Sequence, residues 1–183
     1  MSSENQKIVM TKRLVKEGLL QLLQQMHIDD VRINELCKLA DINRTTFYRH
    51  YRSPHDVLVE VGFDLAREFH ELPTRADTDV RDRVASLCSF LFARKETVKL
   101  FMRNNNYGDT GLIFQNFAED FNDFKEPLFG DRKIDPHVLR LMTTFFAYGC
   151  YTLVSRWLLE DIPLAPDSVA DLIVHMIYHE LDI

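Results

Sequence analysis

Apolar residues recur every three or four positions along almost the whole chain, and no stretch alternates apolar with polar residues as a strand would. This period predicts helices near residues 6–26, 33–39, 43–51, 54–72, 79–94, 96–103, 111–129, 136–159 and 166–181. Pro54, Pro136 and Pro166 suit the first turn of a helix, where the missing N–H costs nothing. The sequence therefore predicts an all-α protein of about nine helices, three short ones followed by a helical bundle.

The charge of the chain is distributed unevenly. The 183 residues carry a formal net charge of -6, yet residues 1–56 hold nine Lys and Arg against seven Asp and Glu. Subtraction from the totals of 22 and 28 leaves 13 basic against 21 acidic residues in the remainder. Such asymmetry indicates two parts with different tasks.

Cysteine usage and apolar runs indicate the compartment. Cys37, Cys88 and Cys150 lie far apart and form no CxxC pair, which favours buried thiols in a reducing environment over a disulfide or zinc site. The first ten residues lack the apolar core of a signal peptide, and no apolar run approaches the roughly 18 residues that cross a bilayer. We expect a cytoplasmic protein with no membrane contact, no metal site and no cofactor.

The stretch LADINRTTFYRHYRSPHDVL, residues 39–58, has the pattern of the second half of a helix-turn-helix. No acidic residue occurs from Ile42 through His55. An exposed helix without acids suits a polyanion, because a carboxylate there would repel phosphate. Arginine can read guanine edges, threonine methyls can contact thymine, and tyrosine and histidine reach phosphates. The alternative is an ordinary charged surface helix.

With the residues just before it, this stretch reads LCKLADINRTTFYRHYRSPHDVL and resembles the signature of the TetR family of bacterial transcriptional regulators, close to IAxxAGVSRGTFYxHFxSKEDLL. The resemblance covers residues 8 to about 65, and TFYRHY is its specific part. It implies that residues 43–50 form a recognition helix in the DNA major groove. Asp41 replaces the usual turn glycine, and Arg32 replaces a usual threonine. The candidate DNA-binding residues are Arg32, Asn43, Arg44, Thr45, Thr46, Tyr48, His50 and Arg52.

The C-terminal stretch FAYGCYTLVSRWLLEDIPLAPDSVADLIVHMI resembles the last two helices of many TetR-family members, which form the four-helix bundle of a dimer. A twofold protein would read two half-sites about 34 Å apart, which implies a homodimer on palindromic double-stranded operator DNA. The alternative is an ordinary intramolecular core. The candidate dimer residues are Phe145, Tyr148, Gly149, Thr152, Val169, Ile173, Met176 and Ile177.

Aromatic residues at helical spacing suggest a pocket for a small apolar or amphipathic ligand, although a phenylalanine-rich core is the alternative. The candidate ligand-binding residues are Phe90, Phe101, Phe114, Phe117, Phe121, Tyr151 and Trp157. His175 and His179 have the spacing of a metal pair, but no further ligand is evident, which favours two surface histidines.

No motif for catalysis is present, so we do not expect an enzyme. We expect a helix-turn-helix DNA-binding domain over residues 1–52 and a helical regulatory and dimerisation domain over residues 53–183. The resulting hypothesis is a homodimeric TetR-like repressor that is relieved by a ligand. The alternatives are an activator or adaptor controlled by a protein partner, and a helical binding protein or enzyme that has lost DNA binding.

Overall fold

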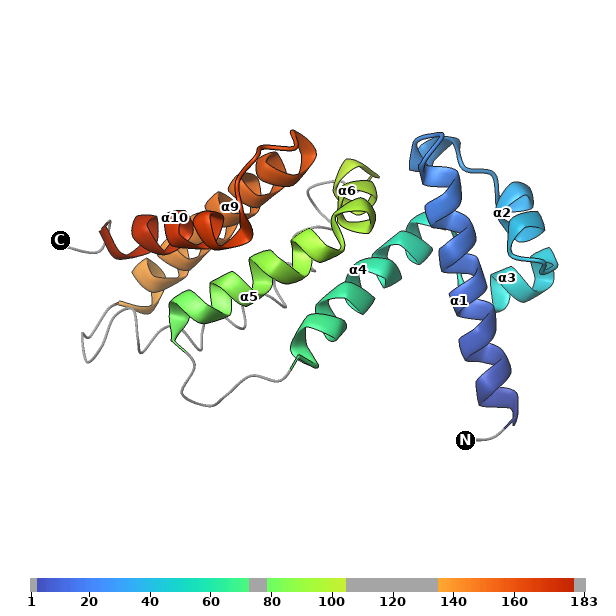
Figure 1. Ribbon diagram of the computed structural model, residues 1–183. Helices are drawn as coiled ribbons and strands as arrows, with labels where there is room; N and C mark the ends of the chain where they lie inside the picture. The colour runs from blue at the N-terminus through green and yellow to red at the C-terminus, as the bar shows by residue number, and fades with distance from the viewer. Residues whose placement is uncertain (1–2, 73–78, 105–134, 180–183) are drawn as a thin grey trace. The chain divides into compact units, whose positions relative to one another are not determined.

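The computed structural model describes residues 3–72, 79–104 and 135–179. Over these residues the chain forms eight α-helices and one 3₁₀ helix, and no strand (Figure 1). The all-α prediction is therefore confirmed. The helices predicted at residues 136–159 and 33–39 have the predicted bounds, and the one predicted near residues 111–129 lies outside the described residues.

The described residues divide into two compact units. The first, which we call the head, comprises the chain up to Leu65 together with Leu100–Asn104. The second, the body, comprises the described residues of 66–99 and those from Asp135 onward. Both divisions fall inside helices, and they differ from the domain boundary after residue 52, which stays a prediction.

The head is built from α1 (Ser3–Leu23), η1 (Ile28–Asp30), α2 (Ile33–Leu39), α3 (Arg44–His50) and the first part of α4 (Pro54–His70). Its core side chains are almost completely buried and come from every one of these elements: Val15, Leu19, Ile28, Leu36, Phe47, Val57 and Leu58. This burial explains why short helices such as α2 and α3 are stable, since helices of seven residues are marginal in isolation.

The start of α4 follows the predicted capping pattern. Ser53 Oγ accepts a hydrogen bond from the Asp56 N–H at 3.2 Å, and Pro54 occupies the first turn. Asp56 Oδ2 in turn accepts from the Arg52 N–H at 2.8 Å. These bonds fix the direction in which the chain leaves α3.

The body contains α5 (Val80–Ala93), the first part of α6 (Lys95–Asn104), α9 (Pro136–Leu159) and α10 (Pro166–His179). Helix α10 packs along α5, and Arg81 Nε of α5 bonds Asp171 Oδ1 of α10 at 2.9 Å. The predicted proline helix starts are confirmed for α9 and α10. None of the described helices is long and apolar enough to span a membrane.

Candidate nucleic-acid interface

The turn between α2 and α3 is closed by backbone hydrogen bonds. The Ile42 N–H donates to the Cys37 carbonyl at 3.0 Å, which is the long bond of a Schellman motif. Asp41, between them, has φ of 51° and so takes the left-handed conformation that glycine adopts most readily. The helix-turn-helix predicted from the sequence is therefore formed, with an aspartate at its strained position.

Helix α3 begins at a side-chain cap. Asn43 Oδ1 accepts a hydrogen bond from the Thr46 N–H at 2.8 Å. The amide of Asn43 is thus used to start the helix. We therefore regard Asn43 as a residue that orients α3, with its acceptor already engaged.

Helix α3 has one buried and one exposed side. Phe47 and Tyr51, four residues apart, are 0% and 4% exposed. The opposite side exposes basic and polar side chains at the same spacing, namely Arg44, Thr45, Tyr48 and Arg49. We call these four residues the α3 face. Arg49 is an addition to the residues selected from the sequence, and the i,i+4 spacing from Thr45 is the signal that finds it.

Two residues of the α3 face contact each other. Arg44 Nη2 donates to the Tyr48 hydroxyl at 3.2 Å, and its guanidinium lies 5.6 Å from the centre of the Tyr48 ring. This hydrogen bond raises the pKa of Arg44 above its ordinary value, so its charge is permanent. The pair presents a cation and an aromatic hydroxyl together, which is a combination suited to base edges and phosphates.

Arg52 differs from the residues of the α3 face because an acid lies beside it. Its Nε bonds Asp56 Oδ2 at 3.2 Å, while the Arg52 side chain stays 92% exposed. Burial alone would raise the pKa of Asp56, but the hydrogen bonds from Arg52 and Ser53 outweigh it and lower that pKa. The i,i+4 spacing of Arg52 and Asp56 could have revealed this pair, which moderates the positive charge available to a phosphate.

The remaining candidates have varied surroundings. Arg32 is exposed at the N-cap position of α2, and its side chain makes no capping hydrogen bond. Thr46 and His50 are half-buried. His50 also packs edge-on against Tyr51, with ring centres 6.5 Å apart. Arg32 therefore lies at the start of α2 and not on α3, although both helices belong to the head.

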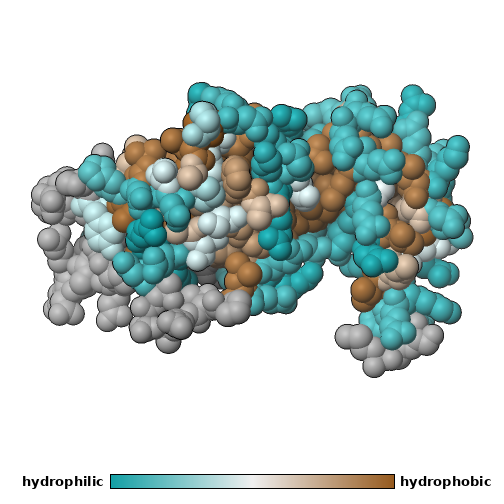
Figure 2. Space-filling model, in the orientation of Figure 1, coloured by the Kyte–Doolittle hydropathy of each residue, from teal (hydrophilic) through white to brown (hydrophobic). Residues whose placement is uncertain are grey.

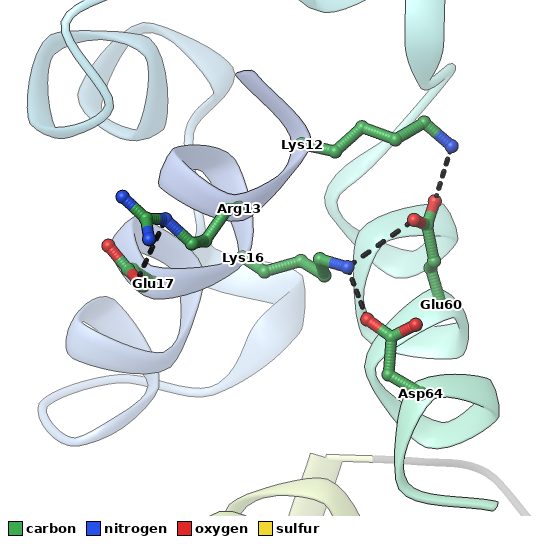
Figure 3. A network of polar contacts seen from close by, with 6 residues as sticks. All are labelled: Lys12, Arg13, Lys16, Glu17, Glu60 and Asp64. Atoms are coloured by element: carbon green, nitrogen blue, oxygen red, sulfur yellow. Dashed lines mark hydrogen bonds and ion pairs between the residues drawn. The ribbon is translucent and has the colours of Figure 1, made fainter. Parts of the chain in front are cut away.

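A polar network joins α4 to α1 (Figure 3). Lys12 Nζ of α1 bonds Glu60 Oε2 of α4 at 3.0 Å and also lies 5.5 Å from the Tyr51 ring centre. Lys16 bonds both Glu60 and Asp64, and Figure 3 shows its ammonium between the two carboxylates. We call Lys12, Lys16, Glu60 and Asp64 the α1–α4 network.

The α1–α4 network changes the acidity of its members. Burial would raise the pKa of Glu60, but hydrogen bonding with Lys12 and Tyr51 and the charges of Lys12 and Lys16 outweigh burial and lower it. The buried Tyr51 hydroxyl makes no hydrogen bond of ordinary geometry with the described residues. Burial and the neighbouring carboxylates raise the pKa of Tyr51 far above its ordinary value. The network therefore holds α4 to α1 with charges, and the Tyr51 hydroxyl lies close enough to Glu60 to affect its pKa.

The candidate ligand residues are distributed over both units. Phe90 and Trp157 are 4% and 2% exposed within the body, while Phe101 belongs to the head. Phe90 packs against Phe69, and Trp157 stacks on Phe92 with ring centres 5.4 Å apart. Tyr151 is half-buried, and Phe114, Phe117 and Phe121 lie outside the described residues. Phe90 and Trp157 thus have aromatic partners, as expected in a phenylalanine-rich core.

Most of the apolar stripe predicted on α10 is buried inside the subunit. Val169, Ile173 and Ile177 are 1%, 5% and 2% exposed, because α10 packs them against α5. Their burial within one subunit favours the intramolecular alternative for these three, and their assignment to a subunit contact stays a prediction. Periodicity identified a buried stripe correctly but could not say which helix covers it.

The other residues predicted for the dimer contact are exposed to solvent. Phe145, Tyr148 and Met176 are 68%, 51% and 49% exposed, and Gly149 and Thr152 are exposed as well. Val138 and Leu141, at 48% and 72%, continue the stripe toward the start of α9. Figure 2 shows apolar surface among hydrophilic residues over α9 and α10. We call Val138, Leu141, Phe145, Tyr148, Gly149 and Thr152 the α9 face.

Solved structures of transcriptional regulators share this fold. A TetR transcriptional regulator from Streptococcus agalactiae 2603V matches with a TM-score of 0.75 at 16% identity, over 95% of this chain and 97% of its own. The dihydroxyacetone kinase operon activator DhaS matches with 0.64 at 11% identity, over 94% and 97%. The fatty acid degradation regulator FadR from Bacillus halodurans matches with 0.59 at 13% identity, over 91% and 97%. No protein-family model and no curated protein matches the sequence. The chain has the fold of TetR-type regulators.

Proposed function

We propose that this protein is a DNA-binding transcriptional regulator of the TetR type that acts as a homodimer on double-stranded operator DNA. The observation that carries the proposal is the α3 face, four exposed basic and polar residues without an acid among them, on the second helix of a helix-turn-helix. A surface of this kind favours phosphate and base contacts, whereas an ordinary solvated helix carries both signs of charge.

The dimer is supported by the α9 face. Monomeric soluble proteins rarely leave a continuous apolar helix stripe in water, and one helix-turn-helix reads only a few base pairs. A second copy of the same face would cover the stripe and place two heads on two half-sites. With three stripe residues of α10 buried in the subunit, we assign the contact to the α9 face and the exposed Met176 and Leu172 of α10.

Control by a small apolar or amphipathic ligand is the next part of the proposal. Its support is the aromatic content of the body, together with α4, whose residues up to Leu65 belong to the head and the rest to the body. A ligand that moved the body end of α4 would alter the recognition helices of the dimer and thereby the fit to DNA.

Activation in place of repression is the second candidate, and the fold match to an operon activator favours it. In vitro transcription from the operator-bearing promoter separates the two, since a repressor lowers and an activator raises the transcript yield. A protein partner that binds the body in place of a ligand would belong to the activator or adaptor alternative.

The proposal is tested by titrating the full chain against a labelled duplex from upstream of its own gene, with fluorescence anisotropy as the readout. A scrambled duplex of equal length and the same salt concentration is the control. We expect the upstream duplex to bind at least about 1,000-fold more tightly than the scrambled one. Equal affinity for both duplexes would favour a helical protein that has lost specific DNA binding.

A further inference from the structure

Tyr48 contacts the core of the head on one side and Arg44 on the other. Its ring meets the Phe47 ring edge-on, with ring centres 5.7 Å apart and an angle of 81° between the ring planes. Phe47 is 0% exposed, whereas Tyr48 is 49% exposed. Tyr48 is therefore a surface residue whose ring rests against a fixed residue of the core.

The Arg44 guanidinium is held at Tyr48 by two different contacts. One is the 3.2 Å hydrogen bond from Arg44 Nη2 to the Tyr48 hydroxyl, and the other is the position of the guanidinium 5.6 Å from the ring centre. A long arginine side chain in water samples many rotamers, and these contacts select the ones in which the guanidinium lies at Tyr48. Arg44 is thus partly preorganised before a ligand binds.

The partner of Arg44 leaves its positive charge intact. Arg52, by contrast, bonds the Asp56 carboxylate, which offsets the charge of Arg52. The Tyr48 hydroxyl is neutral and accepts one N–H of Arg44 Nη2, and the guanidinium has no other hydrogen-bond partner among the described residues. The donors of Nη1 and Nε therefore stay free for a ligand, in the planar fork of a guanidinium.

A planar fork of two N–H donors distinguishes the bases in the major groove. Guanine presents two acceptors there, O6 and N7, and can accept from both donors. Adenine presents one acceptor beside an amino group, thymine one carbonyl beside a methyl group, and cytosine an amino group, so each leaves a donor unpaired. Arg44 is the first residue of α3, and the first residues of the second helix of a helix-turn-helix contact base edges.

We propose that Tyr48 is a positioning residue that holds Arg44 for the readout of a guanine, and that each half-site of the operator contains this guanine. The inference rests on the proposed function and deepens it by naming the base and the residue that orients the arginine. Tyr48 acts through Arg44 and not through a phosphate contact of its own.

The test uses the full chain and the duplex from upstream of its own gene, with each guanine in turn replaced by 7-deazaguanine. This base keeps its pairing and its O6 but lacks the N7 acceptor. Fluorescence anisotropy at one salt concentration gives the affinities. The unmodified protein should lose roughly five- to ten-fold in affinity at one guanine per half-site, since one of two hydrogen bonds is removed. Arg44→Ala should be insensitive to that replacement, which identifies the guanine that Arg44 contacts.

Tyr48→Phe measures the role of the hydroxyl. It keeps the ring and removes the acceptor for Arg44 Nη2, so the loss of affinity caused by 7-deazaguanine should shrink to about two-fold, with affinity for a scrambled duplex unchanged. Added to Arg44→Ala, it should leave operator affinity nearly unchanged, since the residue that it positions is gone. Tyr178→Phe, at an exposed tyrosine of α10, is the matched control and should keep the full effect of 7-deazaguanine.

Tyr48→Leu removes the ring together with the hydroxyl. A smaller effect of 7-deazaguanine in this variant alone would assign the positioning of Arg44 to the ring. An undiminished effect in both Tyr48→Phe and Tyr48→Leu would overturn the inference, because Arg44 would then read the guanine without help from Tyr48.

Two further outcomes would also overturn it. The first is an equal loss of affinity for operator and scrambled duplex with Tyr48→Phe, which is the effect of a lost phosphate contact. The second is insensitivity of the unmodified protein to 7-deazaguanine at every position while specific binding is intact, which leaves the proposed function standing. Equal affinity of the unmodified protein for operator and scrambled duplex would instead remove the proposed function, so the two failures are distinguishable.

Discussion

Head and body expose opposite kinds of surface on helices of the same fold. In the head, α3 buries its two aromatics and exposes arginine, threonine and tyrosine. In the body, the first half of α9 exposes Leu141, Phe145 and Tyr148, and burial becomes dense only from Val154 onward. The difference supports the two proposed partners, a polyanion for the α3 face and a second copy of this chain for the α9 face.

The largest effect is expected from a substitution in the apolar α9 face. Phe145→Asp places a charge at the middle of the α9 face, and burying it in a dimer without a partner is costly. If the dimer dissociates, each head binds one half-site, and about half of the specific binding free energy, roughly 5 kcal/mol, is lost. Light scattering and operator titration measure the two consequences.

The control for Phe145→Asp is Arg140→Asp, which places the same carboxylate at an exposed residue of α9 about a third of a turn around the helix from Phe145. We expect it to leave mass and affinity nearly unchanged. A subunit mass of 21.5 kDa for the unmodified protein at micromolar concentration, together with specific operator binding, would contradict the role given to the α9 face.

The next effect concerns the charged side of the comparison. Arg44→Ala removes the first long cation of the α3 face and its contact with Tyr48. Specific operator binding should weaken about ten- to hundred-fold, with relaxed preference at one base pair per half-site. Titration against single-base operator variants measures both. Unchanged sequence preference would mean that another residue of α3 reads that position.

A smaller effect concerns the support beneath the α3 face. Glu60→Gln removes the carboxylate shared by Lys12 and Lys16 and should lower the free energy of unfolding by about 1–3 kcal/mol, between exposed and fully buried ion pairs. Urea unfolding followed by circular dichroism measures it. Tyr51→Phe, which removes the buried hydroxyl beside Glu60 and keeps the carboxylate with its two lysines, is the matched comparison and should cost less stability than Glu60→Gln.

The same carboxylate gives a pH dependence. The pKa of Glu60 is lowered in the folded protein, so the folded state binds its proton less readily than the unfolded state. Its contribution to stability is present above the ordinary glutamate pKa of about 4.3 and is lost as the pH falls through the lower folded value. Glu60→Gln should therefore reduce the acid sensitivity of unfolding below pH of about 5. An identical pH profile in both proteins would contradict a stabilising network.

The smallest effect concerns the turn. Asp41 adopts φ of 51°, at the end of α2, where its charge also opposes the helix dipole. Asp41→Gly should raise the free energy of unfolding by up to about 1 kcal/mol, and Asp41→Val should lower it by about 1–2 kcal/mol. Thermal unfolding compares them. A destabilising Asp41→Gly would show that the aspartate side chain itself supports the turn.

The comparison also shows what the sequence can predict. Local signals were sufficient for the fold: proline and cap residues located the starts of α4, α9 and α10, and Asn43 located α3. The faces of α3 followed from the four-residue spacing of Phe47 and Tyr51. Such signals act within one turn of a helix, which is why they can be read from a single chain.

Pairings between distant residues could not be predicted in the same way. The burial of Ile173 depends on α5, the hydrogen bond from the Ile28 N–H to Asn104 Oδ1 joins residues 76 positions apart, and the α1–α4 network depends on two helices meeting. Each contact is decided by tertiary packing, and hydrophobic periodicity does not identify which helix or residue will be the packing partner. The Arg52–Asp56 pair is different, because its i,i+4 spacing was visible in the sequence.

The central claim is that two copies of the α3 face read DNA together. The most direct measurement is selection of bound duplexes from a random pool by the unmodified full chain, followed by sequencing. The account predicts enrichment of an inverted repeat whose half-site centres lie about 10 base pairs, or a multiple of that, apart, and loss of this enrichment with Arg44→Ala. A pool that stays random after repeated rounds, or enrichment of a single unrepeated half-site, would contradict it.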